Sequence, residues 1–208
     1  MHGTGRRVGG DSIVLAMVTP RTIRAGSTRV MPWKNGQGST TELAVEPPGA
    51  NLDDFLWRVS IAELRAPGPF STFPGYDRII TQLDGPPMTL THGGGLPLTL
   101  QPLVPHAFSG DDETDCDVAG IAHDFNLIVR RDHACATLEV HTLSEGETLA
   151  GDADAVTLLH LIEGDLAVSD GERLSEGDTR IEKAGTKASH RVVGHALVLV
   201  ATLRGADA

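Results

Sequence analysis

Apolar and polar residues alternate along much of the chain with the period of two that is typical of β-strands. Between Phe55 and Ala62 one set of alternate positions is wholly apolar (Phe55, Trp57, Val59, Ile61) and the other is mixed. No stretch of a dozen residues carries an apolar stripe at helical spacing without an interrupting glycine or proline. The pattern therefore predicts an all-β protein.

One design occurs twice. Residues 78–91 form a strand, an acidic-glycine turn at 84–86 and a second strand, which predicts a hairpin, and residues 157–169 repeat this order around 163–165. Acidic-glycine turns are the commonest hairpin chemistry, so the repeat also has an explanation without duplication. Short strands separated by glycine turns are typical of sandwiches and barrels. Duplicated hairpins without helices favour two jelly-roll β-barrels packed together. Residues 157–181 resemble the cupin superfamily of small β-barrels, and this resemblance implies that both barrels are cupin-like, a bicupin.

Three parts follow from this pattern. Residues 1–17 are expected to be a flexible N-terminal extension, because their first part is rich in glycine and arginine. A charged segment at 130–133 separates two predicted strands and places the boundary between a barrel over residues 18–134 and a barrel over residues 135–208.

The net charge of the chain argues against two classes of binding partner. A formal net charge of -11, without a cluster of lysines and arginines, argues against nucleic acid and against an anionic membrane surface. The apolar run at residues 13–18 is far shorter than the ~20 residues of a membrane span, and no clean cleavage site for an export signal follows it. The two cysteines, Cys116 and Cys135, are expected to be free, although a disulfide between them is not excluded by the sequence. We expect a cytoplasmic protein.

Histidines give little sign of a metal site. No His-x-His pair, the usual start of a cupin metal site, occurs in the chain. His160, His190 and His195 would suit zinc, iron or nickel if they converged. Dispersed histidines on strands more often face solvent or form hydrogen bonds. We therefore expect no metal and no cofactor.

The segment from Met31 to Leu43 carries the densest chemistry. Gly36 and Gly38 allow a ligand to approach the backbone, Lys34 offers a cation, Asn35 can donate and accept, and Trp33 supplies a flat wall. A glycine-rich turn anchored by a buried tryptophan explains the same residues equally well.

A second set of polar residues lies on predicted strands. Arg58 and Ser60 share one strand face, so a guanidinium and a hydroxyl project together, and arginine binds carboxylates through two hydrogen bonds. Asp77, Arg78, Asp124 and Asn126 add polar groups near strand starts. The alternative for these is surface ion pairing and turn capping.

Five motifs between residues 31 and about 131 together resemble the HutD/Ves family of two-cupin bacterial proteins. They are Pro32–Gly36 with Thr41 and Glu42, Trp57–Ala62, Gly68–Arg78, Phe108–Asp111 and Asp124–Asn126. Beyond residue 140 the likeness is only to cupins in general. The resemblance implies a regulator or sensor of histidine utilisation whose ligand is a small acid such as a formyl- or formimino-glutamate. Gln37, within a usual run of glycines, and His106, in place of an aromatic residue, depart from the family pattern.

These observations lead to one main hypothesis and two alternatives. The chain is expected to bind a small anionic metabolite in its N-terminal barrel, with the second barrel as scaffold; a homodimer is among the assemblies that the sequence allows. Lys34, Asn35, Arg58 and Arg78 would hold the anion. The full candidate set is Trp33, Lys34, Asn35, Gly36, Thr41, Glu42, Trp57, Arg58, Ser60, Asp77, Arg78, His106 and Asn126.

The first alternative is a cupin isomerase or hydrolase with Glu42 or Asp77 as general base and a histidine such as His106 as acid. The second is a structural, partner-binding bicupin with no ligand. That alternative predicts that Arg58 is paired outside a barrel filled by apolar side chains.

Overall fold

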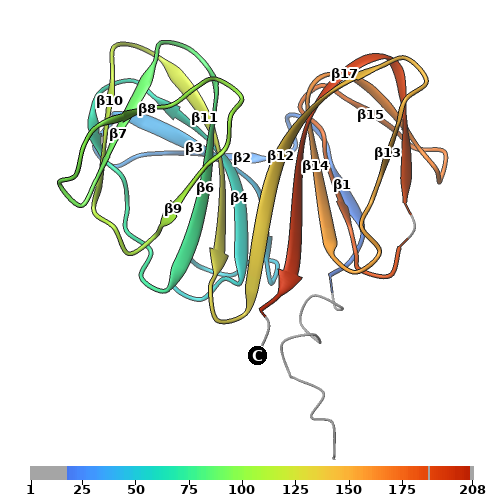
Figure 1. Cartoon of the computed structure of the whole chain (residues 1–208), viewed down its shortest axis with the longest axis horizontal. Helices are drawn as coiled ribbons and strands as arrows, with labels where there is room; N and C mark the ends of the chain where they lie inside the picture. Colours follow the sequence, from blue (N-terminus) through green and yellow to red (C-terminus); the bar gives the residue numbers. More distant parts are fainter. Residues whose placement is uncertain (1–17, 187, 207–208) are drawn as a thin grey trace, which may run out of the picture.

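The computed structural model describes residues 18–186 and 188–206, and every regular element in these ranges is a β-strand. The predicted all-β, two-barrel fold is confirmed: two barrel-like halves of similar size stand side by side (Figure 1). The expected flexible extension over residues 1–17 lies outside the described ranges. No helix in the described part of the chain could cross a membrane.

Two antiparallel sheets face each other in the N-terminal half. In hydrogen-bonding order, the larger sheet contains β2 (Arg29–Pro32), β3 (Gly38–Glu46), β4 (Trp57–Leu64), β11 (Ala122–Arg130), β6 (Tyr76–Asp84) and β9 (His106–Ser109). The smaller sheet contains β5 (Gly68–Pro69), β10 (Thr114–Val118), β7 (Met88–His92) and β8 (Leu98–Thr99). Apolar side chains such as Leu64, Ile80 and Leu90 fill part of the space between them.

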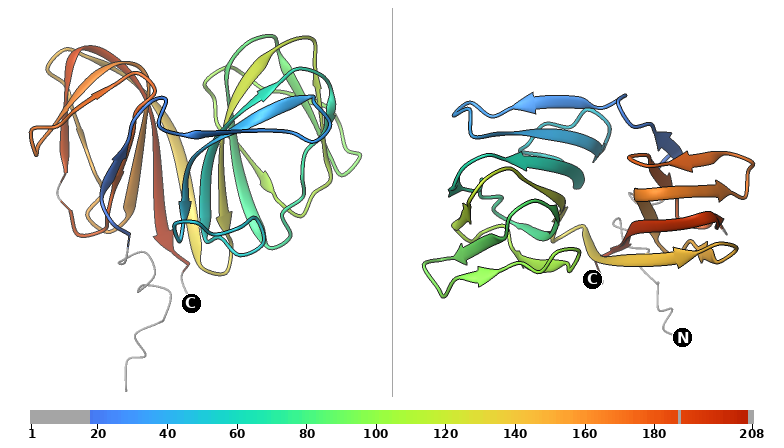
Figure 2. Two further views of the ribbon diagram at one scale, coloured as in Figure 1. Left: turned by 180° about the vertical axis from the view of Figure 1, so that it is seen from behind. Right: turned by 90° about the horizontal axis from the view of Figure 1, so that it is seen from above.

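One seven-stranded sheet forms the C-terminal half. Its strands are β1 (Arg21–Ile23), β16 (Thr179–Glu182), β14 (Val156–Val168), β17 (Ser189–Gly205) and β12 (Ala134–Ser144), with β13 (Thr148–Ala150) on β17 and β15 (Arg173–Ser175) on β14. The long β14 and β17 curl the sheet around a second apolar core that includes Leu161, Leu166 and Val198 (Figure 2).

The hairpin predicted over residues 78–91 is wrong. β6 pairs with β11 and β9, whereas β7 pairs with β10 and β8, so the two strands belong to opposite sheets. The side chain of Gln82 holds this corner: its Nε2 donates to the Pro86 carbonyl at 2.8 Å and its Oε1 accepts from the Met88 amide at 3.2 Å. Because these bonds replace ladder bonds, the turn leads the chain from one sheet to the other.

The turn predicted at residues 163–165 is also different in the structure. β14 continues through it, with register shifts on either side of Gly164. Gly164 has a φ of 89°, and an added Cβ would lie 2.0 Å from the His195 carbonyl oxygen, so only glycine fits this bulge.

The two halves share a continuous core. Trp57 and Phe125, on the outer face of the six-stranded sheet, belong to the same buried cluster as Leu158, Ile181 and Leu203 of the C-terminal sheet. The six-stranded sheet is therefore covered on both faces, which explains why consecutive residues of β11, from Asp124 to Val129, are all buried.

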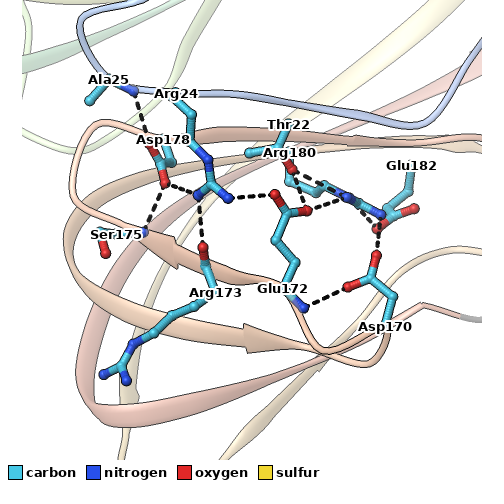
Figure 3. Close-up of polar contacts among 10 residues, drawn as sticks. All are labelled: Thr22, Arg24, Ala25, Asp170, Glu172, Arg173, Ser175, Asp178, Arg180 and Glu182. Atoms are coloured by element: carbon cyan, nitrogen blue, oxygen red, sulfur yellow. Dashed lines mark hydrogen bonds and ion pairs between the residues drawn. The ribbon is translucent and has the colours of Figure 1, made fainter.

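β1 ties the start of the described chain to the C-terminal half. Although it lies within the expected first barrel (residues 18–134), it pairs with β16, inside the expected second barrel (residues 135–208). Figure 3 shows the ionic network around it: Arg180 binds Glu172 at 2.7 Å, Glu182 at 2.8 Å and Asp170 at 3.0 Å. Arg24 binds Glu172 as well. The chain then crosses to β2, so that the N-terminal segment spans both halves.

Candidate functional site

Four polar residues of the predicted set lie together on the inner face of the six-stranded sheet. Arg58 and Ser60 come from β4, Asn126 from the neighbouring β11, and Arg78 from β6 beyond it. Asn126 is opposite Ser60, and Ile128 is opposite both Arg58 and Arg78, so the side chains share one face. All four are buried. The N-terminal barrel thus contains a polar layer beside its apolar core.

The two arginines have different partners. Arg58 donates through Nε to Glu42 Oε2 at 2.8 Å, and the Glu42 side chain is 31% exposed, so this pair reaches the surface. Arg78 donates to Asn126 Oδ1 at 2.9 Å and to the Ser71 carbonyl at 3.1 Å. Within the described residues Arg78 has no carboxylate within ion-pair distance. It is a buried cation held mainly by neutral groups.

Aromatic rings surround the Arg78 guanidinium. Its central carbon lies 4.8 Å from the centre of the Phe108 ring, 5.3 Å from that of Phe70 and 5.6 Å from that of Phe73. Cation–π contacts of this kind stabilise a desolvated guanidinium and fix its plane. Phe70 and Phe73, which belong to the motif Gly68–Arg78, therefore position the cation together with Phe108.

Asp124, which the site prediction omitted, completes the layer. It lies two residues before Asn126 on the same face of β11, is fully buried, and accepts a short hydrogen bond from the Asn126 amide. Burial raises the pKa of its carboxyl to about 7, although the charge of Arg78 acts in the opposite direction. Burial likewise lowers the pKa of Arg78 to about 10, with Asp124 opposing this shift and Arg58 adding to it.

Two polar atoms of this layer, Arg78 Nε and Asp124 Oδ2, are buried without a hydrogen-bond partner among residues 18–186 and 188–206. An unsatisfied buried donor or acceptor is costly, and in native proteins such atoms usually have a role or bind a molecule. The strand period of two could have identified Asp124, because it places residues 124 and 126 on one face.

Three predicted residues point away from this layer. Trp57 lies on the opposite face of β4 from Arg58 and packs between the two halves, so it does not wall the same cavity. Thr41 is opposite Ile61, on the outer face of β3. Asp77 is exposed on the outer side of β6 and pairs with Arg131 at 2.7 Å. Asp77 and His106 therefore lie on opposite faces, which rules out their acting as base and acid on one substrate.

The glycine-rich segment forms a compact turn. Asn35 donates to Gln37 Oε1 and accepts from the Gln37 amide, both at 3.0 Å, so its side chain serves the turn itself. Gly36 takes a positive φ of 71°, and Lys34 is exposed. Trp33 donates to Thr40 Oγ1 at 2.8 Å and packs against the apolar core of the barrel. A ligand-binding role for Lys34, Asn35 and Gly36 stays a prediction.

His106 lies on the inner side of β9 and contacts a residue that sequence reasoning missed. Its Nε2 is 3.0 Å from Nε2 of His92, at the end of β7, and both rings pack near Phe108. Burial lowers the pKa of both imidazoles. His106 thus belongs to a histidine pair beside the arginine layer.

The three histidines of the C-terminal half do not converge. His160 bonds to Thr179 Oγ1 at 2.9 Å and packs on Phe125 between the halves, whereas His190 is fully buried inside the C-terminal core region. His195 is exposed and pairs with Glu163. No group of three or more metal-ligating side chains occurs in residues 18–186 and 188–206.

Two surface pockets lie near the ends of β6. One, of about 330 Å³, lies where β6 and β9 meet β12 and is lined by Arg78, Ile79 and Cys135 among others, so it touches the polar layer at Arg78. The other, of about 570 Å³, lies at the Tyr76 end of β6 beside Arg130 and Arg131. Neither is lined by Arg58, Asp124 or Asn126.

Comparisons with known proteins agree with the motifs. The sequence profile of the HutD family matches residues 25–200. An uncharacterized 21.2 kDa protein from the hutC 3' region of Pseudomonas putida is 47% identical over 107 residues, or 51% of this chain and 56% of that protein. Protein Ves from Cronobacter sakazakii is 37% identical over 123 residues, or 57% of this chain and 66% of Ves. The match therefore spans less than two thirds of either relative.

A solved structure extends the likeness over nearly the whole chain. HutD from Pseudomonas fluorescens, determined in a formate condition, is 32% identical. It superposes with a TM-score of 0.75 and covers 90% of this chain and 99% of its own.

Proposed function

Because the chain belongs to the HutD family, we propose that it is a cytoplasmic sensor or regulator linked to histidine utilisation, which binds a small carboxylate in its N-terminal barrel. The ligand class we propose is a formyl- or formimino-glutamate-type intermediate. The location of a relative in the hutC 3' region and the formate condition of the HutD structure support this pathway and this chemistry. The free cysteines, Cys116 and Cys135, fit a reducing compartment.

One observation carries the proposal: two buried guanidinium groups share one barrel interior, and only Arg58 has a carboxylate partner. Two cations close enough to repel each other gain most from an anion that binds both. Such an anion could also accept from Arg78 Nε, and a donor group of the ligand could bond to Asp124 Oδ2. Arg58 is buried inside the barrel, which argues against the ligand-free alternative that predicted it outside.

Calorimetry tests the proposal. We expect formate and N-formyl-L-glutamate to bind the wild-type chain and Arg58→Ala to weaken binding roughly tenfold or more, because a charge-assisted hydrogen bond is lost. Arg65→Ala is the matched control, since Arg65 also donates through Nε to a glutamate, Glu63, but is exposed. The proposal is wrong if no histidine-pathway acid gives a heat of binding, or if Arg58→Ala binds the ligand with the same affinity as Arg65→Ala.

The same protein samples distinguish a binding protein from the enzyme alternative. Glu42 remains the carboxylate that could act as a general base, although it is engaged by Arg58. Incubation of N-formyl-L-glutamate with the wild-type chain is expected to leave the compound unchanged by NMR. Turnover that disappears in Glu42→Gln would favour the enzyme.

A further inference from the structure

The histidine pair joins the two sheets of the N-terminal barrel. His92 ends β7 of the four-stranded sheet and His106 begins β9 of the six-stranded sheet. Their Nε2 atoms are 3.0 Å apart and their ring centres 5.2 Å apart. Both rings are half-buried, and Phe108 packs against them at 4.6 Å from His92 and 5.9 Å from His106. The two imidazoles are therefore held with their Nε2 atoms facing each other.

Hydrogen bonds around Thr114 determine which ring nitrogen of His92 carries the proton. Thr114 Oγ1 donates to the Asp112 carbonyl at 3.3 Å, so it accepts from His92 Nδ1 at 2.9 Å. His92 then carries its proton on Nδ1, and its Nε2 accepts from the Nε2–H of His106 at 3.0 Å. A metal ion between the two Nε2 atoms would replace this proton, and His106 would carry its proton on Nδ1 instead. Metal-binding histidines commonly show this arrangement, in which the second ring nitrogen donates to a neighbouring oxygen and thereby orients the ligand nitrogen.

The spacing of the two nitrogens matches a shared metal ion. Imidazole nitrogens bind such ions at about 2.0 to 2.1 Å, and two of them at roughly a right angle are about 3 Å apart. Right-angled nitrogen and oxygen coordination is the preference of Ni²⁺ and Cu²⁺. From this geometry we infer that His92 and His106 form a binding site for a divalent transition-metal ion of this class, with water in the remaining positions.

Charged neighbours act on this site with opposite signs. The carboxylate of Asp112 favours a cation near His92, whereas the Arg78 guanidinium disfavours one. Arg78 is bound to Asn126 and covered by Phe108, which limits its effect. The ion would connect two strands that no backbone hydrogen bond joins, because β7 and β9 belong to different sheets. Binding should therefore stabilise the folded barrel.

Titration of the full chain with Ni²⁺ after treatment with a chelator tests the inference. We expect one equivalent to bind, with a rise in Tm, and an affinity at least roughly tenfold lower in His106→Phe and in His92→Phe. Phenylalanine keeps the aromatic packing against Phe108. His141→Gln and His195→Gln are matched controls, because both histidines are paired with glutamates elsewhere, and they should bind as the wild type does.

A second measurement needs no variant. Ni²⁺ is paramagnetic, so substoichiometric amounts should first broaden the NMR signals of His92, His106 and Phe108. Broadening centred on His141 or His195, no stoichiometric binding, or unchanged affinity in the two phenylalanine variants would overturn the inference.

Discussion

Arg78→Met is expected to weaken carboxylate binding roughly 100-fold while leaving the free energy of unfolding within about 1 kcal/mol of the wild-type value. The guanidinium is buried and lacks an ion-paired carboxylate in the described chain, so its desolvation opposes folding. Removing it also removes hydrogen bonds to Asn126 and Ser71, and these two effects offset each other. Methionine packs well among the three phenylalanine rings.

The loss of binding is expected to be larger than for Arg58→Ala, roughly 100-fold, because a charge-assisted bond in a dry interior lies at the upper end of the usual range. No buried charge is stranded by the change, since Asp124 can remain protonated. Calorimetry and urea unfolding measure the two quantities on the same preparation.

Arg131→Met is the matched control: Arg131 is exposed and pairs with Asp77 and Asp111. It should bind the ligand as the wild type does. If Arg78→Met unfolds the protein or binds normally, Arg78 is a structural residue and the proposed site is wrong.

Much of the fold follows from the hydrophobic pattern, and what it missed has a physical cause. Alternation identified β4 and its apolar face of Trp57, Val59 and Ile61. Alternation does not say which strands pair. The sequence of β6 and β7 predicts a hairpin, but hydrogen bonds of the Gln82 side chain stabilise a turn after which β7 joins the other sheet. The resemblance to the HutD/Ves family is confirmed. It could be recognised from the sequence because it depends on local motifs and not on which strands pair.

The candidate site was predictable where side chains lie within one strand and not where they meet across strands. The shared face of Arg58 and Ser60 followed from the period of two. Both faces of β4 are buried, so its sequence does not show which face lines the interior of the barrel. For this reason Trp57, which lies on the outer face, was included in the candidate site. His92 was missed because its contact with His106 joins separate sheets.

Asp124 is expected to make the stability of the fold depend on pH. Its pKa is about 7 in the folded chain and 3.8 in the reference state, so between these values the folded form holds the proton more tightly. This contribution to stability is present in full below the unfolded pKa and is lost as the pH rises through 7. Between about pH 5 and about pH 8 the loss is on the order of 3 kcal/mol.

His160 acts in the opposite direction over much of the same range. Burial between the halves lowers its pKa from 6.5 to about 4, so the unfolded chain takes up the proton first as the pH falls. Its contribution is present above the unfolded pKa and is lost as the pH falls through 4. The two groups partly cancel in the wild type, and only a difference between variants isolates either one.

Asp124→Asn provides that difference, because an amide carries no titrating proton and can still accept from Asn126. Urea unfolding should show the variant gaining stability relative to the wild type by about 3 kcal/mol between about pH 5 and about pH 8. Asp77→Asn, which changes an exposed carboxyl, should run parallel to the wild type over this interval. If the stability of Asp124→Asn also runs parallel to that of the wild type between about pH 5 and about pH 8, Asp124 is ionised over this whole interval. The polar layer would then already contain a compensated negative charge before any ligand binds.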